Sequence, residues 1–110
     1  MQKMSLDALA REHLERARQS GAGRSAETVF GGHEHTLRQT VVALTSGTTL
    51  AEHENPGEAT VHVISGRVRL GSGDDSWEGR DGDLLIIPPA RHDLHALADS
   101  VVLLTVAKRR

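Results

Sequence analysis

With 110 residues and a formal net charge of −2 when histidines are neutral, the chain fits one small domain and lacks the basic excess typical of proteins that bind nucleic acid or acidic membranes. It has no cysteine, which excludes disulfides, thiolate chemistry and cysteine-based zinc sites. No apolar stretch approaches the ~18 residues of a membrane span. The first twenty residues also lack the apolar run of a secretory signal, so we expect a cytoplasmic protein.

Residues 5–19 are expected to form a helix. Ser5 is a suitable N-cap, and Asp7 suits the positive end of the helix dipole. Apolar residues recur there at three- and four-residue spacing and form one stripe: Leu6, Leu9, Ala10, Leu14 and Ala17. His13 is assigned to the polar side, in a structural or solvated role. The segment SGAG at 20–23 then ends the helix. We therefore expect a helix and linker over 1–24, packed on the rest of the chain or on a partner chain.

From residue 25 to residue 110 the pattern changes to short β-rich runs separated by turn residues. The runs are TVF (28–30), TLRQTVVAL (36–44), TTLAEH (48–53), ATVHVIS (59–65), RVRL (67–70), DLLIIP (83–88), DLHAL (93–97) and SVVLLTVA (100–107). Short strands at this spacing predict an antiparallel sandwich or barrel. Ser65 and Gly66 are expected to form the turn of a hairpin. The polar, glycine-rich segment 71–83 is expected to be a surface excursion anchored by Trp77.

The stretch from Gly47 to Gly66 has the spacing of a known motif. Five residues separate Gly47 from His53, Asn55 follows two positions later, and six residues separate Ala59 from Gly66. This resembles the first motif of the cupins, which is Gly, five residues, His-x-His, three or four residues, Glu, six residues, Gly. The spacing matches at every interval. The residue types differ, because Asn55 stands in place of the second His and Ala59 in place of the Glu.

A second segment is similar to the second cupin motif, which is Gly, five residues, Pro-x-Gly, two residues, His. Gly82 and Pro88 keep the five-residue gap, Ala90 stands in place of the second Gly, and His92 follows one residue early. The resemblance covers about residues 36–107. It implies an all-β fold, a cupin-type antiparallel β-barrel (a double-stranded β-helix, or jelly roll), here with an N-terminal α-helix.

The resemblance also implies where a metal would lie. A cupin centre uses three imidazoles and a carboxylate, a set that suits divalent Fe, Mn, Ni, Cu or Zn. The strand face with Ala59, Val61 and Val63 is implied to point into the barrel, which turns Glu58 and His62 outward. We therefore predict His53 and His92 as the metal ligands, with low occupancy, or else no cofactor.

Other residues are open candidates for completing such a site. A bulge near Pro56 would turn Glu58 inward, and His62 is a weaker candidate that suits a surface or a dimer interface. His33 and His35 have the spacing of two ligands on one strand face, but an exposed loop is the favoured interpretation. His95 is out of phase and has no neighbouring ligand residue.

The same residues support a pocket without a metal. His53, Asn55 and His92 offer hydrogen bonds to a small molecule, and Arg91 at the barrel mouth suits an anionic ligand or, more simply, a surface ion pair. Our first hypothesis is a small-molecule-binding cupin with little or no catalytic activity. The alternative is a metal-dependent oxygenase or isomerase acting on a small organic substrate, and a third hypothesis is a structural or sensing partner in a larger assembly.

Two of the predicted strands also bear on assembly. The segments DLLIIP and SVVLLTV are apolar on both faces, which a single barrel would leave partly exposed. We therefore expect a homodimer in which sheets of the two chains cover each other.

Overall fold

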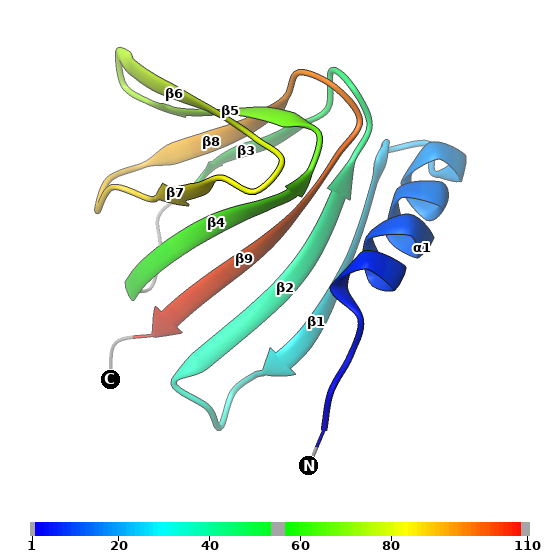
Figure 1. Cartoon of the computed structure of the whole chain (residues 1–110). Coiled ribbons are helices and arrows are strands. Elements are labelled where there is room, and N and C mark those ends of the chain that lie inside the picture. Colours follow the sequence, from blue (N-terminus) through cyan, green and yellow to red (C-terminus); the bar gives the residue numbers. More distant parts are fainter. Residues whose placement is uncertain (1, 54–56, 109–110) are drawn as a thin grey trace.

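The computed structural model describes residues 2–53 and 57–108, and of Glu52 and His53 it describes the backbone. Figure 1 shows one helix followed by strands that form two sheets. The elements are α1 (Leu6–Gln19), β1 (Arg24–Gly31), β2 (Leu37–Leu44), β3 (Thr49–His53), β4 (Gly57–Ser65), β5 (Arg67–Ser72), β6 (Asp75–Arg80), β7 (Leu84–Ile86), β8 (His92–Ala96) and β9 (Ser100–Lys108). In this part of the chain no helix has the length and apolar character that crossing a bilayer requires.

The strands pair antiparallel in two sheets that face each other. The five-stranded sheet has the order β1-β2-β9-β4-β7, and the four-stranded sheet has the order β3-β8-β5-β6. Consecutive strands β4 and β5 lie in different sheets, as do β7 and β8, which is the crossing pattern of a jelly roll. The predicted fold class, a jelly-roll barrel with an N-terminal helix, is confirmed.

The main core fills the space between the two sheets. Ala59, Val61 and Val63 alternate with more exposed neighbours along β4 and are 6%, 2% and 0% exposed, so the inward face is the one the sequence predicted. The cluster comprises Val42, Leu44, Ala59, Val61, Val63, Val68, Leu70, Ile87, Leu94, Ala96, Val102 and Val106. This apolar filling determines the chemical environment of any site inside the barrel.

A second core lies between α1 and the outer face of the five-stranded sheet. The Ser5 hydroxyl accepts a hydrogen bond from the Ala8 backbone N–H at 3.1 Å and so caps the helix as predicted. The buried residues of this core are Ala10, Ala17, Val41, Ala43 and Val101, and Ile64 and Leu103 pack against them. The second apolar face of the last strand is therefore covered largely by the chain's own helix, which corrects the expectation that a partner chain is needed there.

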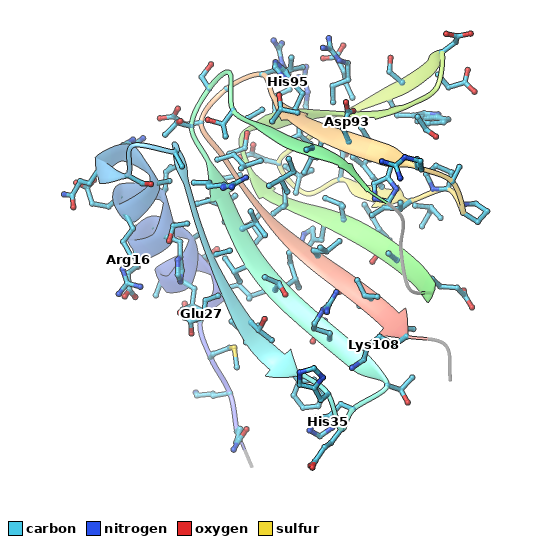
Figure 2. The ribbon with its side chains drawn as sticks, turned by 180° about the vertical axis from the view of Figure 1, so that it is seen from behind. Arg16, Glu27, His35, Asp93, His95 and Lys108 are labelled. Carbon is cyan, nitrogen blue, oxygen red and sulfur yellow. The ribbon has the colours of Figure 1, made fainter. Side chains whose placement is uncertain are left out.

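His13 lies on the buried side of α1, not on the polar side assigned from the sequence. It is 1% exposed. Its Nδ1 lies 2.8 Å from the Ser25 hydroxyl, and its Nε2 lies 2.9 Å from a carboxylate oxygen of Glu27. Figure 2 shows Glu27 on β1 beside the helix. Both ring nitrogens thus have partners, and His13 fastens the helix to the edge strand.

A predicted turn and a predicted surface excursion differ in the structure. Ser65 and Gly66 do not close a hairpin, because β4 pairs with β7 and β9 while β5 pairs with β6 and β8. Gly66, with φ of 101°, instead turns the chain from one sheet to the other, and a Cβ there would overlap the Ser100 hydroxyl. The expected surface excursion contains strand β6, on which Trp77 is 48% exposed.

Candidate functional site

The site is built around His92, the first residue of β8. His92 is 2% exposed, and its Nδ1 lies 2.9 Å from the Ala90 carbonyl oxygen. A carbonyl can only accept, so Nδ1 carries the hydrogen and the lone pair of the neutral ring is on Nε2. A backbone hydrogen bond of this kind fixes the ring orientation of many metal-binding histidines. His92 is therefore held in one orientation and one tautomer by the turn that precedes β8.

A small cavity between the sheets adjoins His92. Its volume is about 20 Å³, and it is lined by Val42, Leu50, Val61, Leu70, Ile87, His92, Leu94, Val102 and Leu104. Among the described residues of this lining, His92 has the single polar side chain. A water needs roughly 10–15 Å³ of such volume, so the cavity is large enough for about one water molecule. An organic ligand of any size would have to lie nearer the barrel mouth.

His53 is paired with His92 across strands β3 and β8. The register matches Leu50 with Leu94 and then His53 with His92, with an irregularity between the two pairs. The predicted site thus brings together the backbones of its two histidines, which lie 39 positions apart in the sequence. The side chain of His53 and all of Asn55 lie outside the described residues, so their roles stay predictions.

The position where the family motif has its acidic ligand carries a methyl group inside the barrel. Ala59 is 6% exposed and pairs with Val106. The neighbouring Glu58 is exposed and lies on the opposite face of β4, as does His62. Neither residue lines the cavity beside His92. The described strand geometry supplies no carboxylate to replace the missing one.

The remaining histidines lie elsewhere. His33 and His35 are exposed in the loop between β1 and β2, where the ring centroids of His35 and Phe30 are 5.3 Å apart. Figure 2 shows His35 at the opposite end of the molecule from His95 and Asp93 on β8. His95 is on the outer face of the smaller sheet, with Nδ1 at 2.6 Å from the Thr49 hydroxyl. None of these three imidazoles adjoins the cavity at His92.

Arg91 precedes His92 at the exposed end of the turn. It is exposed to solvent, and its carbonyl oxygen accepts a hydrogen bond from the Ser72 hydroxyl at 2.9 Å. That bond ties the turn before β8 to the end of β5. The turn is therefore held from both sides, by Ser72 at Arg91 and by the His92 ring at Ala90.

The described side chains alone do not make up the donor set of a tightly held transition-metal ion. Among the described side chains, those of residues 2–51 and 57–108, no group of three or more His, Asp or Glu is placed to hold a metal. The barrel interior contributes His92 and a wall of aliphatic groups. Transition-metal centres of the imidazole type need several converging ligands. The described side chains that line the cavity supply one such ligand, the imidazole of His92.

The sequence did not predict a larger groove on the outside of the five-stranded sheet. It lies where β7 ends beside β4 and has a volume of about 460 Å³. Its lining comprises Gly57, Glu58, Ala59, Thr60, Ile86, Ile87, Pro89, Thr105 and Ala107. The apolar run at 84–87 indicates a buried strand, and nothing in it marks that the strand stops after three paired residues.

Comparisons with known proteins agree with this architecture. A family model described as a cupin domain matches residues 40–107. A conserved protein of unknown function from Streptococcus pyogenes superposes with a TM-score of 0.74 at 24% identity, over 83% of this chain and 79% of the other. KdgF from Halomonas sp. gives 0.66 at 21% identity, over 79% and 82%.

A mutant salicylate 1,2-dioxygenase from Pseudoaminobacter salicylatoxidans gives a TM-score of 0.73 at 19% identity, over 92% of this chain but 32% of that enzyme. A search of curated proteins finds no match. At identities this low, the structural matches establish the fold and leave substrate and activity open.

Proposed function

The chain belongs to the cupin family, and from that premise we propose that it binds a small molecule, or weakly a divalent metal ion, in its barrel and has little or no catalytic activity. The observation that carries this proposal is Ala59, a buried methyl group at the place where the family motif has a carboxylate. A centre without its carboxylate loses the one anionic ligand of the family set. Any bound Fe, Mn, Ni, Cu or Zn ion would therefore be held weakly.

We assign ligand binding to His53, Asn55, Arg91 and His92. His92 supports this role because the hydrogen bond from Nδ1 to the Ala90 carbonyl fixes the orientation of its ring beside the interior cavity. The backbone pairing of His53 with His92 supports His53 as its neighbour in the site and, with His92, as a metal ligand. The Arg91 guanidinium favours an anionic ligand, because it matches carboxylate or phosphate geometry. Because the interior cavity has a volume of about 20 Å³, we infer that such a ligand binds nearer the mouth.

We also propose that the protein is a homodimer. After α1 has covered Val101 and packed against Leu103, the residues Leu84 and Ile86 still expose 59% and 68% of their surface. Exposed large apolar groups next to each other on one sheet favour association. A second copy would remove them from water.

The test of the binding proposal is metal analysis of protein purified without chelator. We expect far less than one transition-metal ion per chain, and we expect His92→Ala to change this little. Near-stoichiometric metal in the wild type that disappears in His92→Ala would contradict the proposal and favour the metal-dependent oxygenase or isomerase. A His95→Ala variant is the matched control, because His95 is on the outer face of the same strand.

A further inference from the structure

We infer that Glu58, Thr60, His62, Leu84 and Ile86 form the face through which two copies of this chain associate, about a two-fold axis that passes close to Thr60. We call these five residues the open face. The inference rests on the homodimer proposed above and adds its surface and geometry. Figure 1 shows α1 on the β1 side of the five-stranded sheet, with β4 and β7 at the other side. The helix therefore leaves the open face accessible.

The registers of β4 and β7 place the five residues on one surface. His62 pairs with Leu84 and Thr60 pairs with Ile86, while Leu85 between them packs toward the core. Edge strands normally carry charges that prevent association. Two of the other three edge strands, β1 and β6, follow this rule with Arg24, Glu27, Asp75, Glu78 and Arg80. Strand β7 is Leu-Leu-Ile and carries none.

The open face has a ridge and a hollow side by side. Leu84 and Ile86 form the ridge, and the groove of about 460 Å³ begins where β7 ends, between Glu58 and Pro89. An interface between two identical copies needs a surface that is complementary to itself. A ridge of one copy that fits the groove of the other meets this need. A small molecule bound in the groove would leave Leu84 exposed, because Leu84 is outside the lining.

Two polar side chains on β4 favour the same arrangement. Glu58 and His62 lie on the outer face of β4, two positions on either side of Thr60. A two-fold axis that runs parallel to the sheet, just outside its outer face, and crosses β4 over Thr60 reverses the strand direction. It places Glu58 opposite the partner's His62 and His62 opposite the partner's Glu58. Leu84, which pairs with His62, then lies over the groove beside the partner's Glu58, so the apolar contacts and the hydrogen bonds between imidazole and carboxylate form together.

The first experiment measures the mass of the full chain by sedimentation over a range of concentrations. We expect the wild type to be a dimer, and we expect Leu84→Lys and Ile86→Lys each to raise the dissociation Kd by at least about tenfold, because each puts a charge into the interface. Met4→Lys is the matched control, since Met4 is 48% exposed and precedes the helix. Circular dichroism checks that each variant is folded.

The second experiment tests the axis with a charge exchange on exposed positions. Glu58→Lys alone should weaken the dimer, and adding His62→Glu should restore it, because the exchange again places a hydrogen-bond donor opposite a carboxylate. A wild-type dimer that none of these variants weakens would overturn the open face while the homodimer stands. A monomeric wild type would overturn both. Weakening by Glu58→Lys without rescue by His62→Glu would overturn the axis at Thr60.

Discussion

Ala59 on β4 lies directly opposite Val106 on β9, and both side chains are buried between the two sheets. The family motif has a carboxylate at the position of Ala59. Here that position belongs to a continuous aliphatic wall that includes Val61 and Val102. An aliphatic wall stabilises the barrel by removing apolar surface from water, whereas a carboxylate there would need a cation or several hydrogen bonds. With alanine in place of the acidic ligand, this position therefore contributes to the apolar core.

The first prediction restores that carboxylate. Ala59→Glu should lower the free energy of unfolding by roughly 2–5 kcal/mol without metal, because it buries an unpaired charge in an apolar wall. Added Ni²⁺ or Zn²⁺ should raise the melting temperature of the variant more than that of the wild type, if His53 and His92 are close enough to share the ion. Ala26→Glu is the control, since Ala26 is exposed on β1. Equal metal responses of the variant and the wild type would contradict a pairing of the two imidazoles.

The second prediction concerns the hydrogen bond that fixes His92. His92→Leu keeps most of the buried volume but removes the donor to the Ala90 carbonyl. We expect it to lower the free energy of unfolding by about 1 kcal/mol, the usual value of one such bond. His92→Ala should cost more, because it also leaves a cavity. Urea unfolding of both variants measures the difference, and a more stable His92→Ala protein would show that the ring does not pack as described.

The third prediction concerns the attachment of α1. His13→Ala should lower the free energy of unfolding by roughly 2–4 kcal/mol, because it empties a buried position and removes two hydrogen bonds. Arg16→Ala, three residues further along the same helix, should cost well under ~1 kcal/mol, because its ion pair with Glu12 is exposed. Urea unfolding of the two variants measures both changes in the free energy of unfolding. Similar costs would mean that the His13 contacts add little to helix docking.

The sequence was sufficient for the fold because strand alternation and glycine spacing depend on local geometry. The inward face of Ala59, Val61 and Val63 follows from a period of two, and the capped start of α1 follows from Ser5. The assignment of His13 to the polar side of the helix is wrong, because its spacing along the helix, and not the polarity of its side chain, determines the face on which it lies. His13 lies three residues after Ala10 and four before Ala17, which places it on the apolar stripe. That spacing could have predicted its burial.

Other features depend on contacts between distant segments, which no local pattern specifies. The turn at Gly66 has the composition of a hairpin, yet the partners of β4 are β7 and β9, which come later in the chain. The groove exists because β7 stops after three residues beside a longer strand. The pairing of His53 with His92 was anticipated through the family motifs, since their spacing in this sequence gives no indication of a contact.

The fourth prediction concerns acid pH and the end of the helix. The backbone N–H of Ser46 and the guanidinium of Arg18 both donate to the Asp99 carboxylate, and they lower its pKa below the ordinary value of 3.8. A carboxyl group with a lowered folded-state pKa stabilises the protein above its unfolded-state pKa, and that contribution disappears as the pH falls through the lower folded value. Asp99→Asn should therefore be less stable than the wild type at neutral pH, and the difference should vanish only below about pH 3.8.

The effect of Asp99→Asn on the free energy of unfolding should be small, because the side chain of Asp99 is 36% exposed. Urea unfolding at a series of pH values measures it. A stability difference that stayed constant into strong acid would mean that Asp99 stabilises the loop through its shape and not through its charge.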